Sequence, residues 1–431
     1  MKKVITLLFI SAMVFVSKDI IAQFSLKADL RTRSEYRNGY KTLPTEETSG
    51  YLLTHQRSRL IATYIKDDLK MNVSIQDSRV WGDSKFRQAG NRLDVFEAWA
   101  EYEFMDNLSI KLGRQQVYYD DKKLFTTADW TDWGQTLDLA LLKYQPEEDM
   151  QIHFALGVNN NADSFYKPFL DSYQVNQPRY LGYLWLHHKF SKKFKLSFYY
   201  VADGSQNKTN PNTIYIRHTI GPYFKLNANG LLANGSFFYQ TGRSFEGKKI
   251  EALSLGLGLG YQWTNTLNLT INLDHRSGSD ISKASFGDKT KSFNNLYGPG
   301  HKDLGYMDYF VKADLQTSHA GINDIFLKMQ LFPKQKWSAY AALHLFLLDQ
   351  YYIENPINEN IVKLDDKTLG KELDLVSSWN IKSYINLSAG FSFLIANSPL
   401  EILKSAKDIT EGLPAFGWLQ LRFTPNLLST K

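Results

Sequence analysis

Arginine residues recur at every second position in two stretches near the start of the chain. Arg31 and Arg33 stand in the first stretch, and Arg57 and Arg59 stand in the second. A guanidinium group offers a planar fork of N–H donors that matches a carboxylate or a phosphate. Because side chains two residues apart lie on one face of an extended strand, each pair could guide an anion along a surface.

Other charged residues follow the same alternation later in the chain. Together with the four arginines, the candidates for lining a water-filled lumen are Lys111, Asp138, Arg217, Arg276, Glu372 and Asp374. Acidic residues gather in one segment, where Glu97, Glu101 and Glu103 stand. Two interpretations remain open. Opposite charges could neutralise each other across the lumen, or they could form a transverse field that selects anions.

The sequence contains no arrangement that predicts catalysis. It has no Gly-rich phosphate loop after a strand and no G-x-S-x-G turn. Cysteine is absent, which excludes a thiol nucleophile, a disulfide scaffold and a cysteine-ligated metal. Asp280, Asp288 and His301 stand in the longest linker, where a hydrolytic site could form, but their spacing does not single them out. We therefore expect no catalytic residues, no cofactor and no metal, with calcium in the outer loops as an alternative at pairs such as Asp120-Asp121.

The first residues have the layout of a secretory signal peptide. Met1-Lys2-Lys3 is a basic start, an apolar run covers residues 4–16, and Ala22 ends a tolerable cleavage site. We expect a signal peptide over 1–22 and one mature domain over 23–431; a short anchor helix is the alternative. Without the leader the net charge of +6 falls to +4 (47 basic minus 43 acidic residues), which is too small to predict nucleic-acid binding.

The dominant period of the mature chain is two residues. Leu253, Leu255, Leu257 and Leu259 alternate with Ser254, Gly256, Gly258 and Gly260, and many other segments repeat the pattern. One apolar face and one wet face indicate strands that separate lipid from water. We count about eighteen such segments, at approximately 24–35, 52–65, 69–80, 93–104, 108–116, 136–145, 150–158, 179–190, 194–203, 214–226, 230–240, 250–263, 266–276, 324–332, 337–348, 371–381, 384–396 and 415–424.

The connections between these segments alternate in length. A tight polar turn follows every even-numbered segment, as at Lys66-Asp67-Asp68, and a longer linker follows every odd-numbered one. This rhythm is typical of an up-and-down antiparallel β-barrel in an outer membrane, with short periplasmic turns and long extracellular loops. The final segment can pair with the first and close the ring. Aromatic residues near segment ends suit the membrane interfaces: Trp81, Trp99, Tyr102, Phe104, Tyr118, Tyr119, Trp263, Trp337, Trp379 and Trp418.

Three motifs resemble the alginate export family of Gram-negative outer membranes. The first motif is Leu112-Gly113-Arg114-Gln115-Gln116, followed by Tyr118-Tyr119-Asp120, Asp129-Trp130 and Asp138. The second motif covers residues 293–301 (FNNLYGPGH) and continues with Gly305 and Asp308. The third motif covers residues 370–374 (GKELD). They come in the family's order and span nearly the whole chain. One departure is Leu137-Asp138, where the family usually has Phe-Asp.

The resemblance implies passive diffusion of an anionic polysaccharide through an eighteen-stranded barrel gated by loops. It places Arg114 near the constriction, although Arg114 could instead fix the third outer loop to the wall through Asp138 or Asp129. We expect contact with outer-membrane lipid, delivery proteins in the periplasm, and a monomer. The alternatives are a general porin for small polar solutes, an outer-membrane enzyme with a rim site, and an adhesive barrel that does not conduct.

Overall fold

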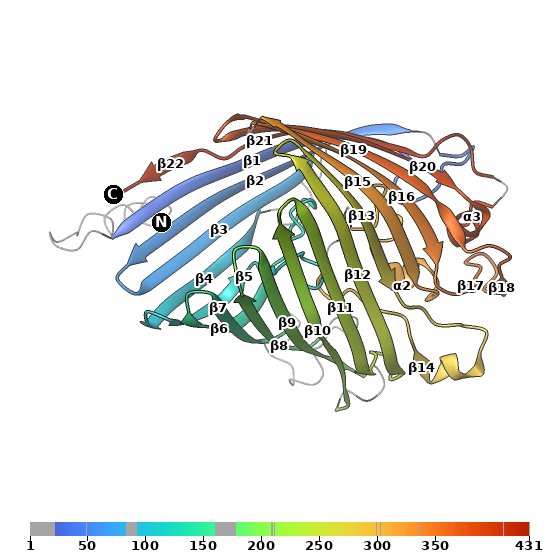
Figure 1. Ribbon diagram of the computed structural model, residues 1–431, viewed down its shortest axis with the longest axis horizontal. Helices are drawn as coiled ribbons and strands as arrows, with labels where there is room; N and C mark the ends of the chain where they lie inside the picture. Colours follow the sequence, from blue (N-terminus) through green and yellow to red (C-terminus); the bar gives the residue numbers. More distant parts are fainter. Residues whose placement is uncertain are drawn as a thin grey trace, which may run out of the picture.

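Eighteen antiparallel strands form a closed barrel in the computed structural model (Figure 1). The structure describes residues 22–430 except 49, 83–92, 160–177, 208, 209, 211, 299, 302, 335 and 408, so the expected signal peptide lies outside the described residues apart from its last one. The strands are β1 Gln23–Asn38, β2 Tyr51–Lys66, β3 Leu69–Val80, β4 Leu93–Met105, β5 Leu108–Gln115, β6 Leu137–Glu147, β7 Met150–Val158, β8 Tyr180–Lys189, β9 Phe194–Gln206, β10 Ile214–Ala228, β11 Leu231–Arg243, β12 Lys249–Thr264, β13 Leu267–Arg276, β15 Ile322–Lys334, β16 Trp337–Leu348, β19 Thr368–Lys382, β20 Ile385–Ala396 and β21 Ala415–Phe423. The predicted strand number and class are confirmed.

The ring closes between the first and the last barrel strand. β1 pairs with β2 on one side and with β21 on the other, and Arg31 stands opposite Arg422 in the second pairing. The chain then continues into a short strand, β22 (Asn426–Ser429), which pairs with the start of β1 beyond the end of β21. The alternating pattern of the final segment predicts that the barrel closes between the last and the first strand. No strand is predicted from the sequence at the position of β22.

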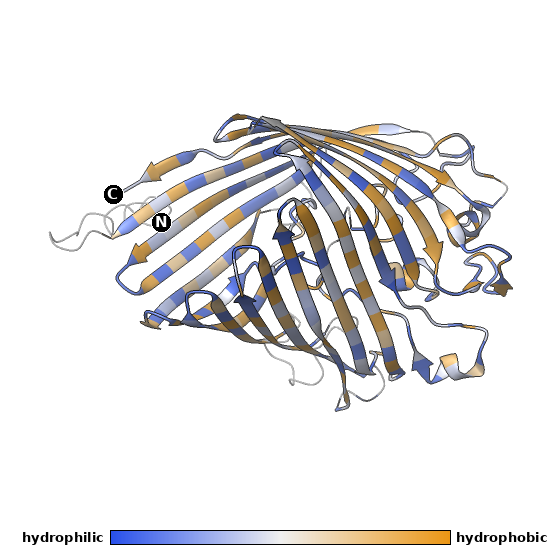
Figure 2. Cartoon of the chain, in the orientation of Figure 1, coloured by the Kyte–Doolittle hydropathy of each residue, from blue (hydrophilic) through white to orange (hydrophobic). Residues whose placement is uncertain are grey.

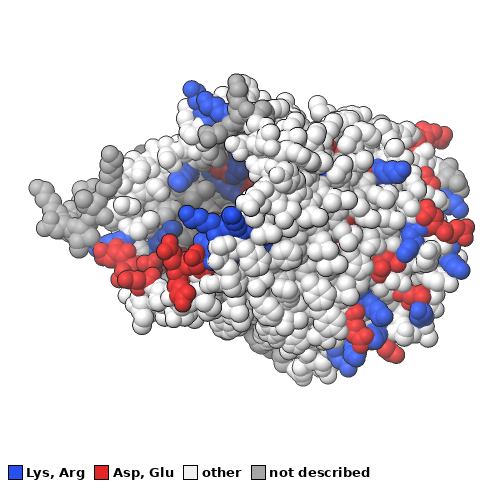
Figure 3. Space-filling model, in the orientation of Figure 1, with Lys and Arg blue, Asp and Glu red and all other residues white. Residues whose placement is uncertain are grey.

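The two faces of the wall have opposite character, as the banded strands of Figure 2 show. Outward residues such as Leu257, Leu259 and Ile271 are apolar and exposed. Charges are scarce over the broad middle of the face in Figure 3 and gather at its two ends. An apolar band of this kind needs a lipid surrounding, because water would make so large an exposed apolar surface unfavourable. No helix in the described residues is long and apolar enough to cross a membrane.

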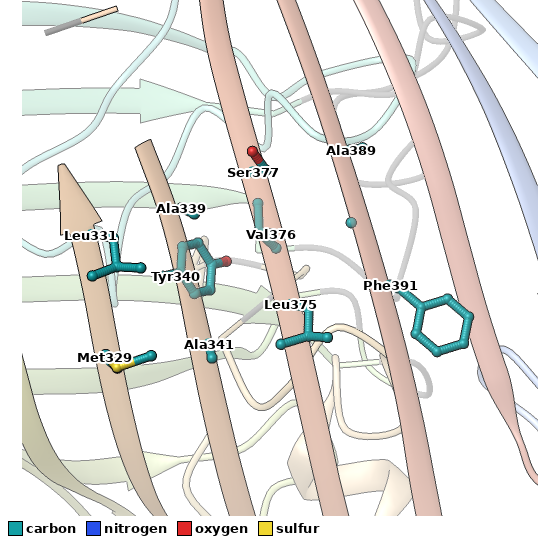
Figure 4. A pocket seen from close by; sticks show the side chains of 11 residues that line it. Met329, Leu331, Ala339, Tyr340, Ala341, Leu375, Val376, Ser377, Ala389 and Phe391 are labelled. Carbon is teal, nitrogen blue, oxygen red and sulfur yellow. The ribbon is translucent and has the colours of Figure 1, made fainter. Parts of the chain in front are cut away.

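The outer face carries a shallow apolar groove of about 460 Å³ across β15, β16, β19 and β20. Small outward side chains, Ala339, Ala341 and Ala389, form its floor in Figure 4, and larger ones such as Leu375 and Phe391 flank it. The groove belongs to the lipid-facing surface and contains no charged residue.

Two long connections fold back into the barrel. Loop A, which we define as residues 116–136, joins β5 to β6, and loop B, residues 277–321, joins β13 to β15. Loop B contains η3 (Ala284–Gly287), β14 (Lys289–Thr290) and α2 (Ala313–Gln316); β17 (Tyr352–Glu354), β18 (Ile361–Lys363) and α3 (Ser398–Leu403) belong to other connections at the same end. Buried apolar residues of loop A pack on β6–β12 together with Phe293 of loop B, whereas the buried apolar residues of loop B from Leu304 onward pack on β15–β21.

Candidate anion-binding site and its inner loops

The arginines of β1, β2 and β21 form a basic wall inside the barrel. The strand register places Arg31 opposite Arg57 on one side and opposite Arg422 on the other, so the three side chains share one row. Arg33 and Arg59 extend the wall along the same face because successive inward side chains are two residues apart. We call Arg31, Arg33, Arg57, Arg59 and Arg422 the arginine wall.

The tip of loop A covers the arginine wall. The Asp129 carboxylate pairs with Arg57 at 2.8 Å, with Arg422 at 3.1 Å and with Arg59 at 3.5 Å. The Asp132 carboxylate lies 3.1 Å from the Arg31 guanidinium. Arg57 is fully buried under this tip and also contacts Asp29 of β1 at 3.3 Å. In this conformation, therefore, the predicted anion-guiding arginines face inward, but carboxylates of the same chain occupy them.

Backbone oxygens of loop A add to the carboxylates. Arg57 donates to the Asp129 carbonyl at 3.1 Å, and Arg31 donates to the carbonyls of Asp129 and Thr131, the latter at 3.1 Å. Each guanidinium fork thus binds several oxygens at once, which is the geometry that makes arginine selective for oxyanions.

Trp130 links loop A to loop B. The Arg33 guanidinium lies 3.8 Å from the centroid of the Trp130 ring on one face. The His301 ring stacks on Trp130 with a centroid distance of 3.8 Å. His301 in turn pairs with Asp308 at 2.8 Å, and Asp308 accepts a hydrogen bond from the Tyr40 hydroxyl. A cation–π contact and a ring stack on one indole therefore couple the positions of the two loops.

The loop A carboxylates stay ionised because of their partners. Burial acts to raise the pKa of Asp129, but the guanidinium groups of Arg57 and Arg422 outweigh it and lower the pKa well below its ordinary value. The same balance lowers the pKa of Asp132, where the hydrogen bond from His55 is the largest favourable contribution. Both groups are therefore anions across the physiological pH range.

The inner wall on β13, β15, β16 and β19 is richer in acid. Glu372 and Asp374 are buried on β19, and His344 lies between Asp324 at 2.8 Å and Asp374 at 3.4 Å. The Glu372 carboxylate accepts the amide N–H of Met307 at 2.9 Å, so it holds loop B. Opposite charges do meet in the lumen, as the neutralising interpretation requires, but each acidic group is engaged mainly with its own neighbours.

Arg276 and Arg217 form local ion pairs on inward faces. Arg276 contacts Asp303 of loop B and lies 3.6 Å from Asp274. Arg217 pairs with Asp203 at 2.8 Å.

Lys111 lies on the inward face near the periplasmic end. Its ammonium group is 3.7 Å from the Trp99 ring centroid. Trp99 therefore faces inward and does not mark the lipid interface. Tyr119 and Trp418 are likewise buried inside the barrel, against the loops.

Arg114 and Asp138 do not line the lumen. They stand opposite each other on β5 and β6, on the same outward face as the exposed Leu112 and Leu142. Two hydrogen bonds of 2.9 and 3.0 Å join the guanidinium to the carboxylate. The expectation that these two residues sit in the pore is wrong, because strand alternation turns both of them outward. Their contact ties together the two strands that flank loop A, which agrees with the alternative role for Arg114.

The candidate residues for catalysis do not come together. Asp280 bonds to Ser282 and Lys283, while His301 pairs with Asp308. Within the described ranges, no three His, Asp or Glu side chains converge as metal ligands.

A family model named "Alginate export" matches residues 22–396. The chain belongs to the alginate export family. Its suspected membership is thereby confirmed. No curated protein is significantly similar to the chain.

Solved structures show the same architecture at low identity. A BenF-like porin from Pseudomonas fluorescens Pf-5 is 11% identical with a TM-score of 0.62, and the match covers 94% of this chain and 99% of that one. Pseudomonas aeruginosa OccK10 (OpdN) is 11% identical with a TM-score of 0.59 over the same shares. OccK5 (OpdH) of the same organism is also 11% identical, with a TM-score of 0.58 and the same coverage. At such identities the similarity concerns the fold alone.

The three family motifs meet inside this barrel although they are far apart in the sequence. Gly113 has φ +116°, and a Cβ there would lie 2.3 Å from the Ala98 carbonyl, so glycine is required where β4 and β5 close. Gln115 is buried and donates to the Leu139 carbonyl at 3.1 Å, which fixes the start of loop A. Tyr297 of the second motif stacks on Phe125 of loop A. Glu372 of the third motif accepts the amide N–H of Met307 in loop B. The motifs thus hold loops A and B in the lumen.

Sequence reasoning missed which residues bind the arginine wall. From the sequence alone, Asp129 is named only within a motif and as a possible partner of Arg114, and Asp132 is not named. The available signal was a pair of aspartates in a connection too long for a simple turn, in a barrel with more inward arginines than neighbouring carboxylates.

Proposed function

We propose that this outer-membrane channel lets anionic polymers pass passively and that its solute is an alginate-like polysaccharide or oligosaccharide. The observation that carries the proposal is the arginine wall, where Arg31, Arg57 and Arg422 stand in one row and hold carboxylates and carbonyls of loop A. The carboxylates of a polyuronate offer the same oxygen chemistry. Displacement of Asp129 and Asp132 by such a solute would therefore exchange one set of charge-assisted bonds for another.

Loop A gates the channel in this proposal, and no energy input is needed from the chain. The chain acts as a monomer after removal of residues 1–22, and periplasmic proteins deliver the polymer. Family membership and porin-like neighbours indicate a channel rather than an enzyme.

Recording of single channels in planar bilayers tests the proposal. We expect anion preference in a KCl gradient and reversible block by an alginate oligomer, with no block by a neutral glucan of the same length. Cation preference combined with absence of block by either polymer would refute passage of a polyanion.

A general porin for small polar solutes is the second candidate. The acidic residues Asp324, Glu372 and Asp374 favour it, because they give the lumen mixed charge. In that case small ions pass with weak selectivity, and the alginate oligomer and the neutral glucan block equally.

A further inference from the structure

Three lysines stand side by side at the periplasmic mouth of the barrel. The register pairs Lys189 of β8 with Lys195 of β9, and Lys195 with Lys225 of β10. Lys189 and Lys195 flank the tight turn Ser191-Lys192-Lys193, and Lys225 stands opposite Lys195, so the row lies near the rim. We call Lys189, Lys195 and Lys225 the lysine row.

The lysine row lies on the lumen side of the wall. Along each strand, the residue two positions deeper on the same face is buried inside the barrel: His187 on β8, Ser197 on β9 and Tyr223 on β10. The outward residues of the same strands, such as Leu196 and Phe198, are apolar and exposed. The row therefore faces the entrance of the lumen rather than lipid.

The lysine row has no carboxylate partner among the residues that the structure describes. None of the three ammonium groups forms an ion pair there, in contrast to the inward lysines Lys111, Lys123 and Lys143, which contact Trp99, Asp274 and Glu101. Like charges directly opposite each other on adjacent strands destabilise a sheet. A row of three is thus an unfavourable arrangement for the barrel alone, and an added anion would relieve it.

The turn next to the lysine row adds further positive charge. Lys192 and Lys193 in the adjacent turn are exposed and add to the positive charge. Figure 3 shows Lys and Arg side chains gathered next to an acidic patch at the end of the barrel where the chain termini lie. A positive patch at a mouth raises the local concentration of anions and their rate of entry.

We propose that the lysine row is a loading site for a polymer that carries closely spaced carboxylates. Adjacent strands are roughly 4.8 Å apart, so the row presents a positive charge about every 5 Å along the rim. An extended polyanion with a similar charge spacing can engage all three ammonium groups, whereas a single small anion engages one or two. The site rests on the proposed function, because it supplies the polymer that the arginine wall then receives.

The triple variant Lys189→Gln/Lys195→Gln/Lys225→Gln tests the loading site. In a bilayer where the channels insert in one direction, an alginate oligomer is added first to the turn side and then to the loop side. We expect the rate of block from the turn side to fall about tenfold, with weaker dependence on ionic strength. The rate of block from the loop side should not change. The shift of the protein band between heated and unheated gel samples reports whether the variant folds. Lys195→Gln alone is a milder variant, for which we expect a smaller fall in the rate of block from the turn side.

The control variant Lys283→Gln/Lys363→Gln/Lys407→Gln removes the same charge at the loop end. It should leave the rate of block from the turn side unchanged. An unchanged rate in the lysine-row variant, or an equal fall in the control, would overturn the loading site while leaving the proposed function intact. If the oligomer blocks the wild-type channel from neither side, passage of the polymer itself is refuted, and the loading site with it.

Discussion

Asp129→Asn should release loop A from the arginine wall. The substitution keeps the size of the side chain but removes the carboxylate that pairs with Arg57, Arg422 and Arg59. Removal of one partner from a buried ion pair costs about 3–5 kcal/mol. Here the Asp129 side chain is 40% exposed, which screens part of the interaction, and the carbonyl contacts to Arg57 remain. We therefore expect a loss of about 2 kcal/mol in docking free energy.

A loss of this size shifts the equilibrium of loop A toward the undocked state by about thirtyfold. The arginine wall also gains one uncompensated positive charge. Both effects act in the same direction, so single-channel recording should show higher conductance and a reversal potential moved toward that of chloride. Asp280→Asn is a matched control, because it removes a carboxylate of loop B whose partners are Ser282 and Lys283. Conductance and selectivity equal to wild type in Asp129→Asn would refute the covering role of loop A.

Three further outcomes follow from the same geometry. The lowered pKa of Asp129 means that its stabilising contribution is complete above the ordinary value of 3.8 and is lost only as pH falls through the lowered value. The difference in conductance between wild type and Asp129→Asn should therefore be the same at pH 8 and at pH 5, and a difference that disappears at pH 6 would contradict this. Replacement of Arg114 by Gln should change barrel stability by less than about 1 kcal/mol in urea unfolding, and ion selectivity not at all, because its ion pair with Asp138 is on the outer face and half-exposed. Leu257→Arg should destabilise the barrel by about 2–4 kcal/mol if the residue lies near the bilayer midplane, as measured by unfolding in lipid vesicles, and a neutral effect would place Leu257 away from lipid.

The strands could be predicted from the sequence because lipid and water impose a period of two on every wall segment. The same rule also predicts the inward position of Arg31, Arg57 and Arg217. Arg114 was assigned to the pore on family resemblance, although its position two residues after the apolar Leu112 already placed it outward. Alternation was the stronger argument at that point.

The inner loops could not be predicted in the same way. Trp99 and Trp418 favour strands wherever they point, so their types do not distinguish a membrane interface from an inner face packed against loops. The contacts of Asp129 depend on the path of a connection with no periodic pattern. Pairing of β22 with β1 depends on how far β1 extends beyond the end of β21.

Passage of a polyanion tests the central claim most directly. The purified protein is reconstituted in vesicles that contain a labelled alginate oligomer and a labelled neutral glucan of equal length. The efflux of both polymers is then measured in one sample. We expect rapid efflux of the oligomer, slower efflux of the glucan, and a larger difference between them in Asp129→Asn. Retention of the oligomer, or equal efflux of both polymers in wild type and variant, would contradict a channel in which the arginine wall selects its solute.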